Sequence, residues 1–292
     1  MTRAEQVDPA LLEQFPLPRI AEDAGKEDRG RLLVIAGSRE LAGAALLAGI
    51  AALRSGAGKL QIGTAASLKT ALAVAVPEAR VIGYPETEDG CIAEEGVDPL
   101  VGWAKAAQAV AIGCGMTHGP PLETLLSRLL GCGAEIPLVL DAAVLDCLAP
   151  LEAQVRAWRG GLILLPHAGE MAKLLDRDRA EVEARPGTAA IEAARRFNAV
   201  ALVKGQFSFI AAPDGRLFRL EGGGVGLATS GSGDTLSGIV GGLCARGADP
   251  LNACLWGTWL HAEAGRILTE EVGRIGFLAR EIPDLIPGLL PD

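Results

Sequence analysis

Residues 222–234 form a glycine-rich segment, Gly222-Gly-Gly-Val-Gly-Leu-Ala-Thr-Ser-Gly-Ser-Gly-Asp234. Behind it, apolar residues recur at the spacing of one helix face: Leu236, Ile239, Val240 and Leu243. This pattern predicts a turn followed by an amphipathic helix that begins near Gly233 or Asp234. Glycine lets a phosphate approach the backbone closely, and the first N–H groups of a helix have no intrahelical partner. Together with the helix dipole, these features predict that the turn binds phosphate.

Strand-like and helix-like segments alternate along the chain before this turn. Short apolar runs that end at glycine or a polar residue predict buried parallel strands at residues 31–36, 60–64, 110–113, 137–141, 162–165 and 200–203. Helical spacing is found between them, at residues 42–55, 121–130 and 187–197. Asp214-Gly215 predicts a hairpin turn between strands 207–212 and 216–220. The alternation predicts an α/β fold with a doubly wound, mostly parallel sheet and helices on both faces.

The chain has 292 residues, of which 49% are hydrophobic, so it can bury the core of one large α/β domain. We expect a single catalytic domain over residues 31–292. Residues 1–30 carry Pro16, Pro18 and a charge cluster, and are predicted to form an irregular lead-in.

The formal net charge of −9 argues against nucleic acid or an anionic membrane as a partner, since either needs a basic patch. A nucleotide ligand stays compatible with this charge, because backbone amides bind phosphate without net positive charge. The longest apolar run, residues 41–53, is too short to span a bilayer. Six cysteines without C-x-x-C spacing favour reduced thiols, so we expect a soluble, cytoplasmic protein.

A carboxylate in the first turn of the predicted helix has two explanations. Asp234 can cap the helix N-terminus. It can also act as a general base beside a transferred phosphoryl group, taking the proton from an attacking hydroxyl. Spacing alone does not choose between the two.

The segment Ser230-Gly-Ser-Gly-Asp-Thr-Leu-Ser-Gly238 resembles the G-x-G-D signature of ribokinase-like enzymes. In that superfamily the aspartate is the catalytic base and the adjacent backbone forms an anion hole. The resemblance implies these roles for Asp234 and for Gly231, Ser232 and Gly233. The wider match, which starts at Gly226, resembles the nucleotide-dependent NAD(P)H-hydrate dehydratases, and the likeness extends over residues 28–285.

Three further motifs resemble the substrate side of the same family. Gly43-Ala-Ala-Leu-Leu-Ala48 implies a substrate contact at Ala44, although tight helix–sheet packing also explains such small residues. Ala111-Ile-Gly-Cys-Gly-Met116 resembles an A-x-G-x-G turn and implies a contact at Gly115. Leu164-Leu-Pro-His-Ala-Gly-Glu170 resembles a T-P-H-P-G-E turn and implies a ligand contact at His167. We expect His261, in contrast, to be a satisfied core histidine.

The nucleotide side rests on Val203-Lys-Gly-Gln-Phe-Ser208, which resembles a K-G-x-x-T turn that holds nucleotide phosphates. The resemblance implies nucleotide binding by Lys204, Gly205, Gln206, Phe207 and Ser208, with the serine hydroxyl in place of threonine. Asp141 follows a predicted strand. It either orients Mg²⁺ through water or caps the next helix, and the sequence leaves both open.

The resemblance implies dehydration of hydrated NADH or NADPH, driven by phosphorylation with ADP or ATP and Mg²⁺, in a homo-oligomer. A small-molecule kinase of the same superfamily and a non-catalytic nucleotide-binding protein are the alternatives. Three positions depart from the family pattern: Cys114 and Ala168 stand where proline is usual, and Gly224 stands where asparagine is usual. The third departure bears on substrate specificity more than on the phosphate site.

Overall fold

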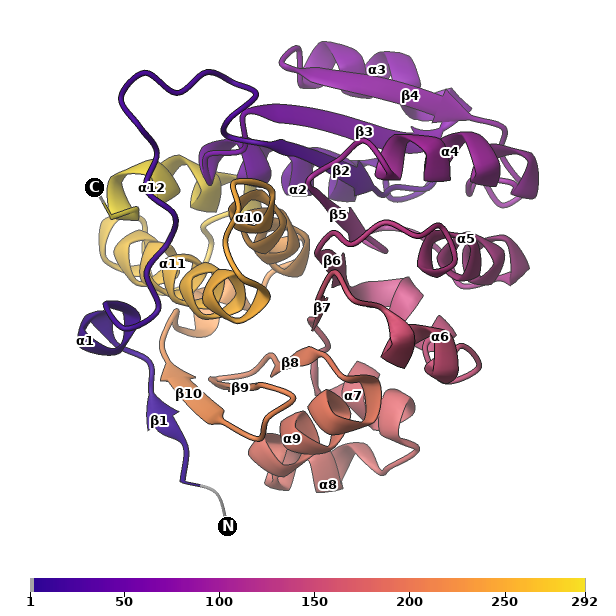
Figure 1. The fold of residues 1–292 in the computed structure, drawn as a ribbon. Helices are drawn as coiled ribbons and strands as arrows, with labels where there is room; N and C mark the ends of the chain where they lie inside the picture. The colour runs from indigo at the N-terminus through magenta and orange to yellow at the C-terminus, as the bar shows by residue number, and fades with distance from the viewer. Residues whose placement is uncertain (1–2, 292) are drawn as a thin grey trace.

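A computed structural model describes residues 3–291, and a ten-stranded sheet runs through its centre (Figure 1). The strand order is β1-β10-β9-β8-β7-β6-β5-β2-β3-β4. Seven consecutive strands in this order, from β8 to β4, are parallel to their neighbours, and β9 is antiparallel to both β8 and β10. The strands are β1 (Glu5–Gln6), β2 (Arg31–Ile35), β3 (Lys59–Ala65), β4 (Ala79–Tyr84), β5 (Ala109–Ile112), β6 (Leu138–Leu140), β7 (Leu162–Leu164), β8 (Val200–Val203), β9 (Phe207–Ala211) and β10 (Leu217–Glu221).

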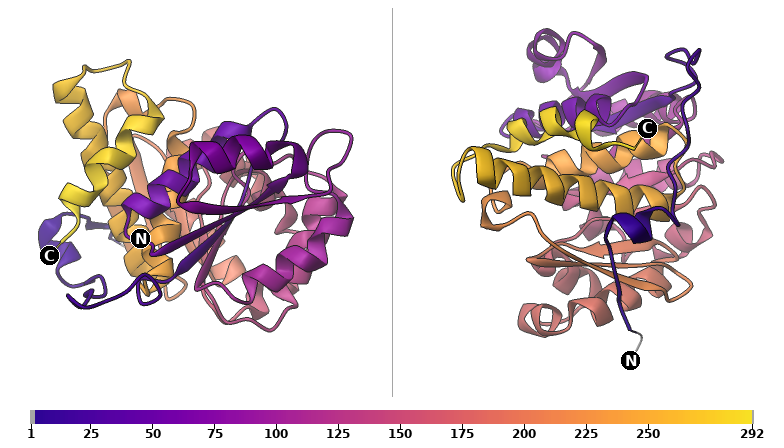
Figure 2. Two further views of the ribbon diagram at one scale, coloured as in Figure 1. Left: turned by 90° about the horizontal axis from the view of Figure 1, so that it is seen from above. Right: turned by 90° about the vertical axis from the view of Figure 1, so that its left-hand side faces the viewer.

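Helices cover both faces of the sheet, as Figures 1 and 2 show. One layer contains α2 (Ala42–Arg54), α3 (Lys69–Ala75), α10 (Ser232–Ala245), α11 (Pro250–Glu271) and α12 (Ile282–Leu289). The other contains α4 (Val97–Ala104), α5 (Pro120–Leu130), α6 (Glu152–Ala157), α7 (Ala168–Leu175), α8 (Arg179–Ala184) and α9 (Pro186–Phe197). The predicted α/β fold with a mostly parallel sheet is confirmed.

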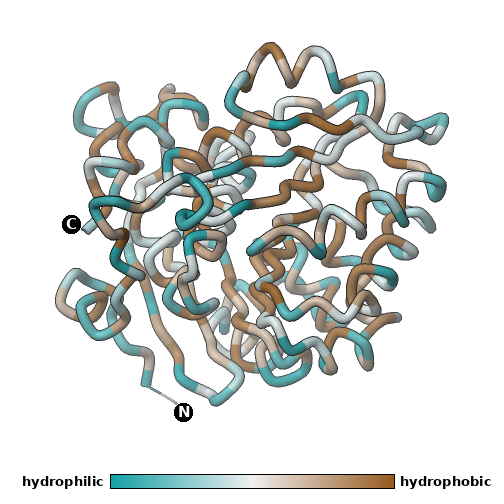
Figure 3. The backbone as a smooth tube through the Cα atoms, turned by 45° about the horizontal axis from the view of Figure 1, so that its top comes forward, coloured by the Kyte–Doolittle hydropathy of each residue, from teal (hydrophilic) through white to brown (hydrophobic). Residues whose placement is uncertain are grey.

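The sheet separates two apolar clusters, because side chains of a strand alternate between its faces. Leu32 and Val34 of β2 pack with the α2–α10 layer, whereas Leu33 and Ile35 pack with the α4–α5 layer. Both sets are buried, which explains why the strand sequences are continuous apolar runs. The hydropathy-coloured tube shows the apolar strands in the interior and the polar residues in the outer turns (Figure 3).

Helix α10 lies very close to α2, and small residues make this approach feasible. A Cβ on Gly238 would lie 2.1 Å from the Ala48 carbonyl oxygen, and one on Gly242 would lie 2.6 Å from that of Ala52. Any larger residue would therefore push the two helices apart. The packing fixes α10, whose first turn carries the predicted phosphate turn, against α2.

The N-terminal segment is more ordered than an irregular lead-in. Strand β1 pairs in parallel with β10, and a short helix, α1 (Pro9–Leu12), begins at an N-cap whose Asp8 carboxylate accepts from Leu11 N–H. The chain then runs along α11, where the Trp256 indole donates to the Phe15 carbonyl at 2.8 Å (Figure 2). Sequence reasoning missed this strand because two residues have no periodicity to detect. No helix within residues 3–291 has the length and hydropathy needed to cross a membrane.

Candidate active site

The predicted site residues gather at one edge of the sheet, where the parallel strands end. Asp141 follows β6, His167 lies three residues after β7, and Lys204 follows β8. The start of α10 faces the same edge, since a Cβ on Gly233 would lie 3.5 Å from Lys204 Nζ and 4.0 Å from Asp141 Oδ2. Ligands of open α/β sheets bind outside the carboxyl ends of the strands, so this edge is the candidate active site.

The first turn of α10 presents free backbone donors. Gly231 is the N-cap residue with φ +88° and no side-chain cap, and the N–H groups of Gly233 and Asp234 have no hydrogen-bond partner within residues 3–291. A side chain at position 231 would be strained at this φ, and its Cβ would lie 2.4 Å from Leu47 Cδ1. The turn therefore combines unpaired N–H groups with the positive end of a helix dipole, which is an anion-binding arrangement.

Asp234 is the third residue of α10 and half-buried. No hydrogen bond joins its carboxylate to the free N–H groups of its own helix, so the capping explanation finds no support. Burial raises the pKa of Asp234, and the nearby charge of Asp141 raises it further, whereas a hydrogen bond from the Cys114 thiol and the charge of Lys204 act in the opposite direction. A carboxyl group with a raised pKa, aimed beside an anion-binding turn, has the properties of a general base.

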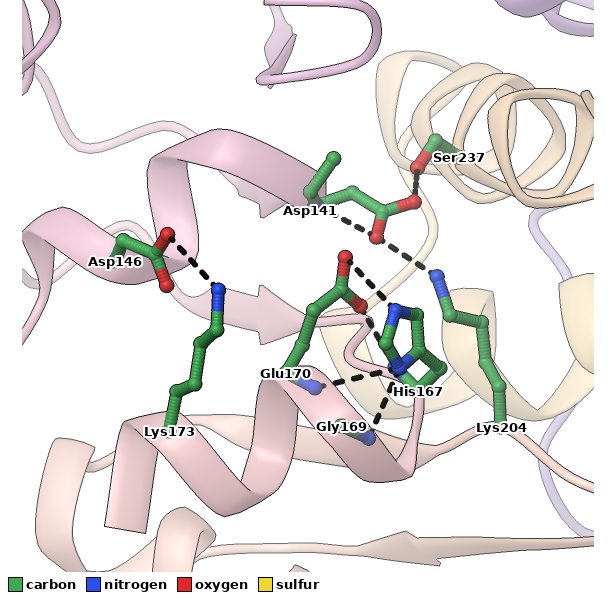
Figure 4. A network of polar contacts seen from close by, with 9 residues as sticks. Asp141, Asp146, His167, Gly169, Glu170, Lys173, Lys204 and Ser237 are labelled. Carbon is green, nitrogen blue, oxygen red and sulfur yellow. Dashed lines mark hydrogen bonds and ion pairs between the residues drawn. The ribbon is translucent and has the colours of Figure 1, made fainter. Parts of the chain in front are cut away.

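Asp141 is the centre of a buried polar network, drawn in Figure 4. Its Oδ1 accepts from Lys204 Nζ at 2.8 Å and from the Ala142 N–H at 2.9 Å, and its Oδ2 accepts from the Ser237 hydroxyl at 2.6 Å. Asp141 is therefore the N-cap of the following 3-10 helix, η3 (Ala142–Cys147), as one of the two predictions stated. Ala142 has φ +52°, which is a strained backbone conformation for a residue other than glycine. Strained residues of this kind cluster at functional sites.

The magnesium role of Asp141 stays a prediction. No group of three or more His, Cys, Asp or Glu residues capable of holding a metal occurs in the described part of the chain. Both oxygens of Asp141 already accept hydrogen bonds. This fits a Mg²⁺ ion that is held mainly by phosphates and water, which is the usual protein environment of Mg²⁺.

Lys204 extends from the end of β8 towards the start of α10. Burial disfavours its charge, but the carboxylates of Asp141 and Glu170 outweigh that effect and raise its pKa, so the ammonium is retained. In the β8–β9 turn, Gly205 and Gln206 are exposed, and Phe207 lies under the Arg219 guanidinium at 4.1 Å. The Ser208 hydroxyl is half-buried and donates to the Gly205 carbonyl at 3.4 Å. Lys204 and the exposed turn at Gly205 and Gln206 therefore lie at the end of β8, on one side of the candidate site.

His167 has a structural role that sequence reasoning missed. It is the N-cap of α7: its Nδ1 accepts from Gly169 N–H at 3.0 Å and from Glu170 N–H at 3.3 Å, and Glu170 Oε2 accepts from His167 N–H at 2.8 Å (Figure 4). The sequence contains a signal for this cap, because Glu170 lies three residues after His167, which is the spacing of a capping box. The His167 side chain is 60% exposed at the sheet edge, and its ligand contact stays a prediction.

Ala44 and Gly115 lie against each other on the β2–β5 side of Asp234. A Cβ on Gly115, which has φ +64°, would lie 2.5 Å from Ala44 Cβ and 2.7 Å from the Leu41 carbonyl oxygen. Cys114, at the position where proline is usual, is buried against Asp234, and burial together with the nearby carboxylates raises its thiol pKa. The structure therefore brings the two predicted substrate contacts together beside the predicted base.

His261 of α11 supports the phosphate turn from behind. Its Nε2 lies 3.0 Å from both the hydroxyl and the carbonyl oxygen of Ser232, and burial lowers its pKa to about 4. A buried, hydrogen-bonded core histidine was predicted, but its contact with the anion-binding turn was not. The predicted contact at Ser232 concerns the backbone, because the side chain is buried.

Comparison with known proteins places this geometry in a family. A family model described as NAD(P)H-hydrate dehydratase matches residues 32–288. A protein of Xanthomonas campestris pv. campestris named ADP-dependent (S)-NAD(P)H-hydrate dehydratase is 46% identical over 289 residues, which covers 99% of this chain and 96% of that protein.

Solved structures agree with the sequence comparison. The ADP/ATP-dependent NAD(P)H-hydrate dehydratase from Bacillus subtilis, co-crystallized with ATP/Mg²⁺, is 30% identical, with a TM-score of 0.82 over 98% of this chain and 97% of that one. A ribokinase-like superfamily protein from Enterococcus faecalis is 22% identical with a TM-score of 0.82, over 98% and 95% of the two chains. The fold is therefore ribokinase-like, as the sequence motifs implied.

Proposed function

The chain belongs to the NAD(P)H-hydrate dehydratase family, and from this we propose that it restores hydrated NADH and NADPH to NAD(P)H with ADP or ATP as phosphoryl donor. The observation that carries the proposal is the position of Asp234. Its carboxylate is close enough to feel the charge of Lys204, which follows β8, and to accept a hydrogen bond from the thiol of Cys114, which precedes Gly115 in the turn after β5. A base in this position serves a reaction between two separately bound molecules.

In the proposed first step, Asp234 takes the proton of the ring hydroxyl as that oxygen attacks the terminal phosphorus of the donor. The bond from this phosphorus to the donor's bridging oxygen breaks, and AMP or ADP leaves. Charge on the transferred phosphoryl group is stabilised by the N–H groups of Gly233 and Asp234 and by the Lys204 ammonium. The raised pKa of Asp234 favours proton uptake at this moment.

In the second step, phosphate leaves with the electron pair of its bond to carbon. The lone pair of the ring nitrogen forms the iminium, and loss of a proton from the neighbouring carbon gives the dihydronicotinamide. The protein has little to add here beyond excluding water. The balance is hydrate plus ADP giving NAD(P)H, AMP and phosphate, or the same reaction with ATP giving ADP.

Mg²⁺ supplies charge neutralisation on the donor phosphates when it is bound. Asp141 would hold it through water, because both carboxylate oxygens are already engaged. Relatives are named as ADP-dependent, and the Bacillus subtilis structure as ADP/ATP-dependent, so we include both donors in the test.

The experiment incubates the protein and hydrated NADH with Mg²⁺ and either ADP or ATP, and follows the return of the near-ultraviolet absorbance of the reduced nicotinamide ring. Return of absorbance with stoichiometric phosphate supports the proposal. A stable phosphorylated alcohol in place of NADH would support a kinase. Asp234→Asn should lower kcat at least ~10²-fold with little change in nucleotide KM, because it removes only the base; unchanged turnover would refute the assignment.

We further propose that the protein acts in the cytoplasm as a homo-oligomer. Unpaired cysteines support the first statement: all six have free thiols, and four of them are buried. Light scattering coupled to gel filtration tests the second, and a monomeric mass at micromolar concentration would contradict it.

A further inference from the structure

His261 is a buried titratable residue that the proposed reaction does not use. It lies on the face of α11 that packs against α10: four residues earlier on this face, a Cβ on Gly257 would lie 2.6 Å from Val240 Cγ2. The His261 side chain is buried, and its Nε2 lies 3.0 Å from both the carbonyl oxygen and the hydroxyl oxygen of Ser232. The histidine therefore contacts the first residue of α10, directly before Gly233 with its free N–H group.

The surroundings of Nε2 decide which nitrogen of the His261 ring carries the proton. Burial lowers the pKa of His261 to about 4, so the ring is neutral at neutral pH and has a single N–H. A carbonyl oxygen can only accept a hydrogen bond, so an unprotonated Nε2 would place its lone pair against that of the Ser232 carbonyl. The proton is therefore on Nε2, which donates to the Ser232 carbonyl, and the Ser232 hydroxyl oxygen lies within reach of the same N–H.

The Ser232 carbonyl and the Gly233 N–H belong to the same peptide unit. In a trans peptide the C=O and N–H bonds lie in one plane and point in opposite directions. The hydrogen bond from His261 therefore also fixes the direction of the Gly233 N–H, which is a free donor of the anion-binding turn. Hydrogen bonds in a chain polarise one another, by perhaps 10–30% per bond, so the Gly233 N–H becomes a stronger donor to a phosphate oxygen.

The preceding peptide unit is held by a different side chain. The buried Thr235 hydroxyl donates to the Gly231 carbonyl at 3.1 Å, which fixes the N-cap of α10. In the part of the chain that the structure describes, His261 is the one side chain that hydrogen-bonds to the Ser232 carbonyl. The orientation of the Gly233 N–H thus depends on a contact from α11 as well as on the helix to which it belongs.

We propose that His261 is a positioning residue for the reaction: its Nε2–H donates to the Ser232 carbonyl and thereby aims and strengthens the Gly233 N–H that binds the transferred phosphoryl group. This inference rests on the proposed function. It deepens that function, because it assigns a share in phosphate binding to a side chain that does not itself touch the phosphate.

The kinetic test replaces the ring without its N–H. His261→Phe should lower kcat/KM for the phosphoryl donor, ADP or ATP, by about ten-fold. This is less than the roughly 10²–10³-fold cost of losing a complete anion-hole donor, because the Gly233 N–H stays in place but is weaker. The KM for hydrated NADH should change by less than about two-fold, since the turn serves the donor. His261→Gln should recover most of the loss, because its side-chain amide can donate to the same carbonyl.

A second measurement does not depend on turnover. Labelling serine with ¹³C at the carbonyl and glycine with ¹⁵N selects the Ser-Gly peptide units, which are Ser55-Gly56, Ser230-Gly231, Ser232-Gly233 and Ser237-Gly238. Gly233→Ala removes the Ser232-Gly233 signal and so assigns it. In His261→Phe the carbonyl ¹³C and amide ¹⁵N shifts of this signal should both move upfield, because the peptide unit is less polarised, and in His261→Gln they should return towards the wild-type values.

Thr258→Val is the matched control, because Thr258 is also buried in α11 and its hydroxyl donates to the Cys254 carbonyl of the same helix at 2.7 Å. It should leave the donor kinetics and the Ser232-Gly233 signal at wild-type values. Thermal melting checks the fold of each variant, and His261→Leu replaces His261→Phe if the latter does not fold.

An unmoved Ser232-Gly233 signal in His261→Phe would overturn the proposal, and so would a moved signal with unchanged donor kinetics or an equal kinetic loss in Thr258→Val. If the wild-type protein repairs hydrated NADH with neither donor, the proposed function fails, whereas the labelled signal still reports whether His261 polarises the turn. The two failures are therefore distinguishable.

Discussion

Gly233→Ala should separate phosphate binding from stability. An added Cβ would meet no atom closer than Lys204 Nζ at 3.5 Å and Asp141 Oδ2 at 4.0 Å, which are ordinary contacts. Gly233 is the second residue of α10, where alanine is favoured over glycine by at most the roughly 0.5–1 kcal/mol that applies in a helix interior. The variant should therefore be as stable as the wild type or melt about 1–3 °C higher.

The same methyl group occupies the space between the Lys204 ammonium and the free N–H groups. A phosphate oxygen that bonds to both needs to approach them to about 2.9 Å. We expect the KM for ADP to rise at least ~10-fold, which corresponds to about 1.4 kcal/mol of lost binding. Gly102→Ala in α4, where a Cβ meets nothing within 4 Å, is the control that shares the helix effect without the site. A Gly233→Ala protein that melts normally and retains the wild-type KM for ADP would refute the phosphate-binding role of this turn.

Two pH-dependent effects follow from the same region. The pKa of Asp234 is raised, so activity should fall on acidification at a higher pH than for an ordinary aspartate, which a kcat/KM profile with hydrated NADH measures; an acid limb at or below pH 3.9 would contradict it. Burial lowers the pKa of His261 to about 4 in the folded state, from about 6.5 in the unfolded chain. The unfolded chain therefore binds this proton more tightly than the folded protein does. The contribution of His261 to the free energy of unfolding is fully present above pH 6.5 and declines as the pH falls towards 4. Denaturant unfolding should show a loss of up to about 3 kcal/mol over this window, and His261→Gln should flatten that decline; an unaltered pH slope in the variant would exclude His261 as its source.

Local sequence was sufficient for the main features of the site. The free N–H groups at the start of α10 were predictable because glycine spacing and the apolar period that follows are both local signals. The strand ends at Asp141 and Lys204 were predictable for a similar reason: each closes a continuous apolar run. Since parallel strands end at one edge, their meeting also followed from the fold class.

Interactions between distant segments were not predictable in this way. The hydrogen bond from Ser237 to Asp141 joins residues that are 96 positions apart, and the Arg39–Glu86 pair spans 47 positions. The sequence contains no periodic signal for either pair. Each pair forms because helices and turns from distant parts of the chain pack together, and the conformational preference of a single segment does not determine such packing. The capping box at His167 is different, because Glu170 lies three residues after the histidine and this spacing is a local signal.

The two carboxylates at the sheet edge differ in a way that assigns their roles. Asp141 is almost fully buried, and its oxygens accept from the Lys204 ammonium, the Ser237 hydroxyl and a backbone N–H. These partners compensate its negative charge and make it a poor acceptor for a substrate proton. Asp234 has neither an ion pair nor a backbone donor within the described residues, and burial, together with the charge of Asp141, raises its pKa. When the environments of two neighbouring acids differ in this way, the two groups take different acid–base roles. We therefore propose that Asp234 is the proton acceptor, and that Asp141 keeps Lys204 in place and contributes to the raised pKa of Asp234.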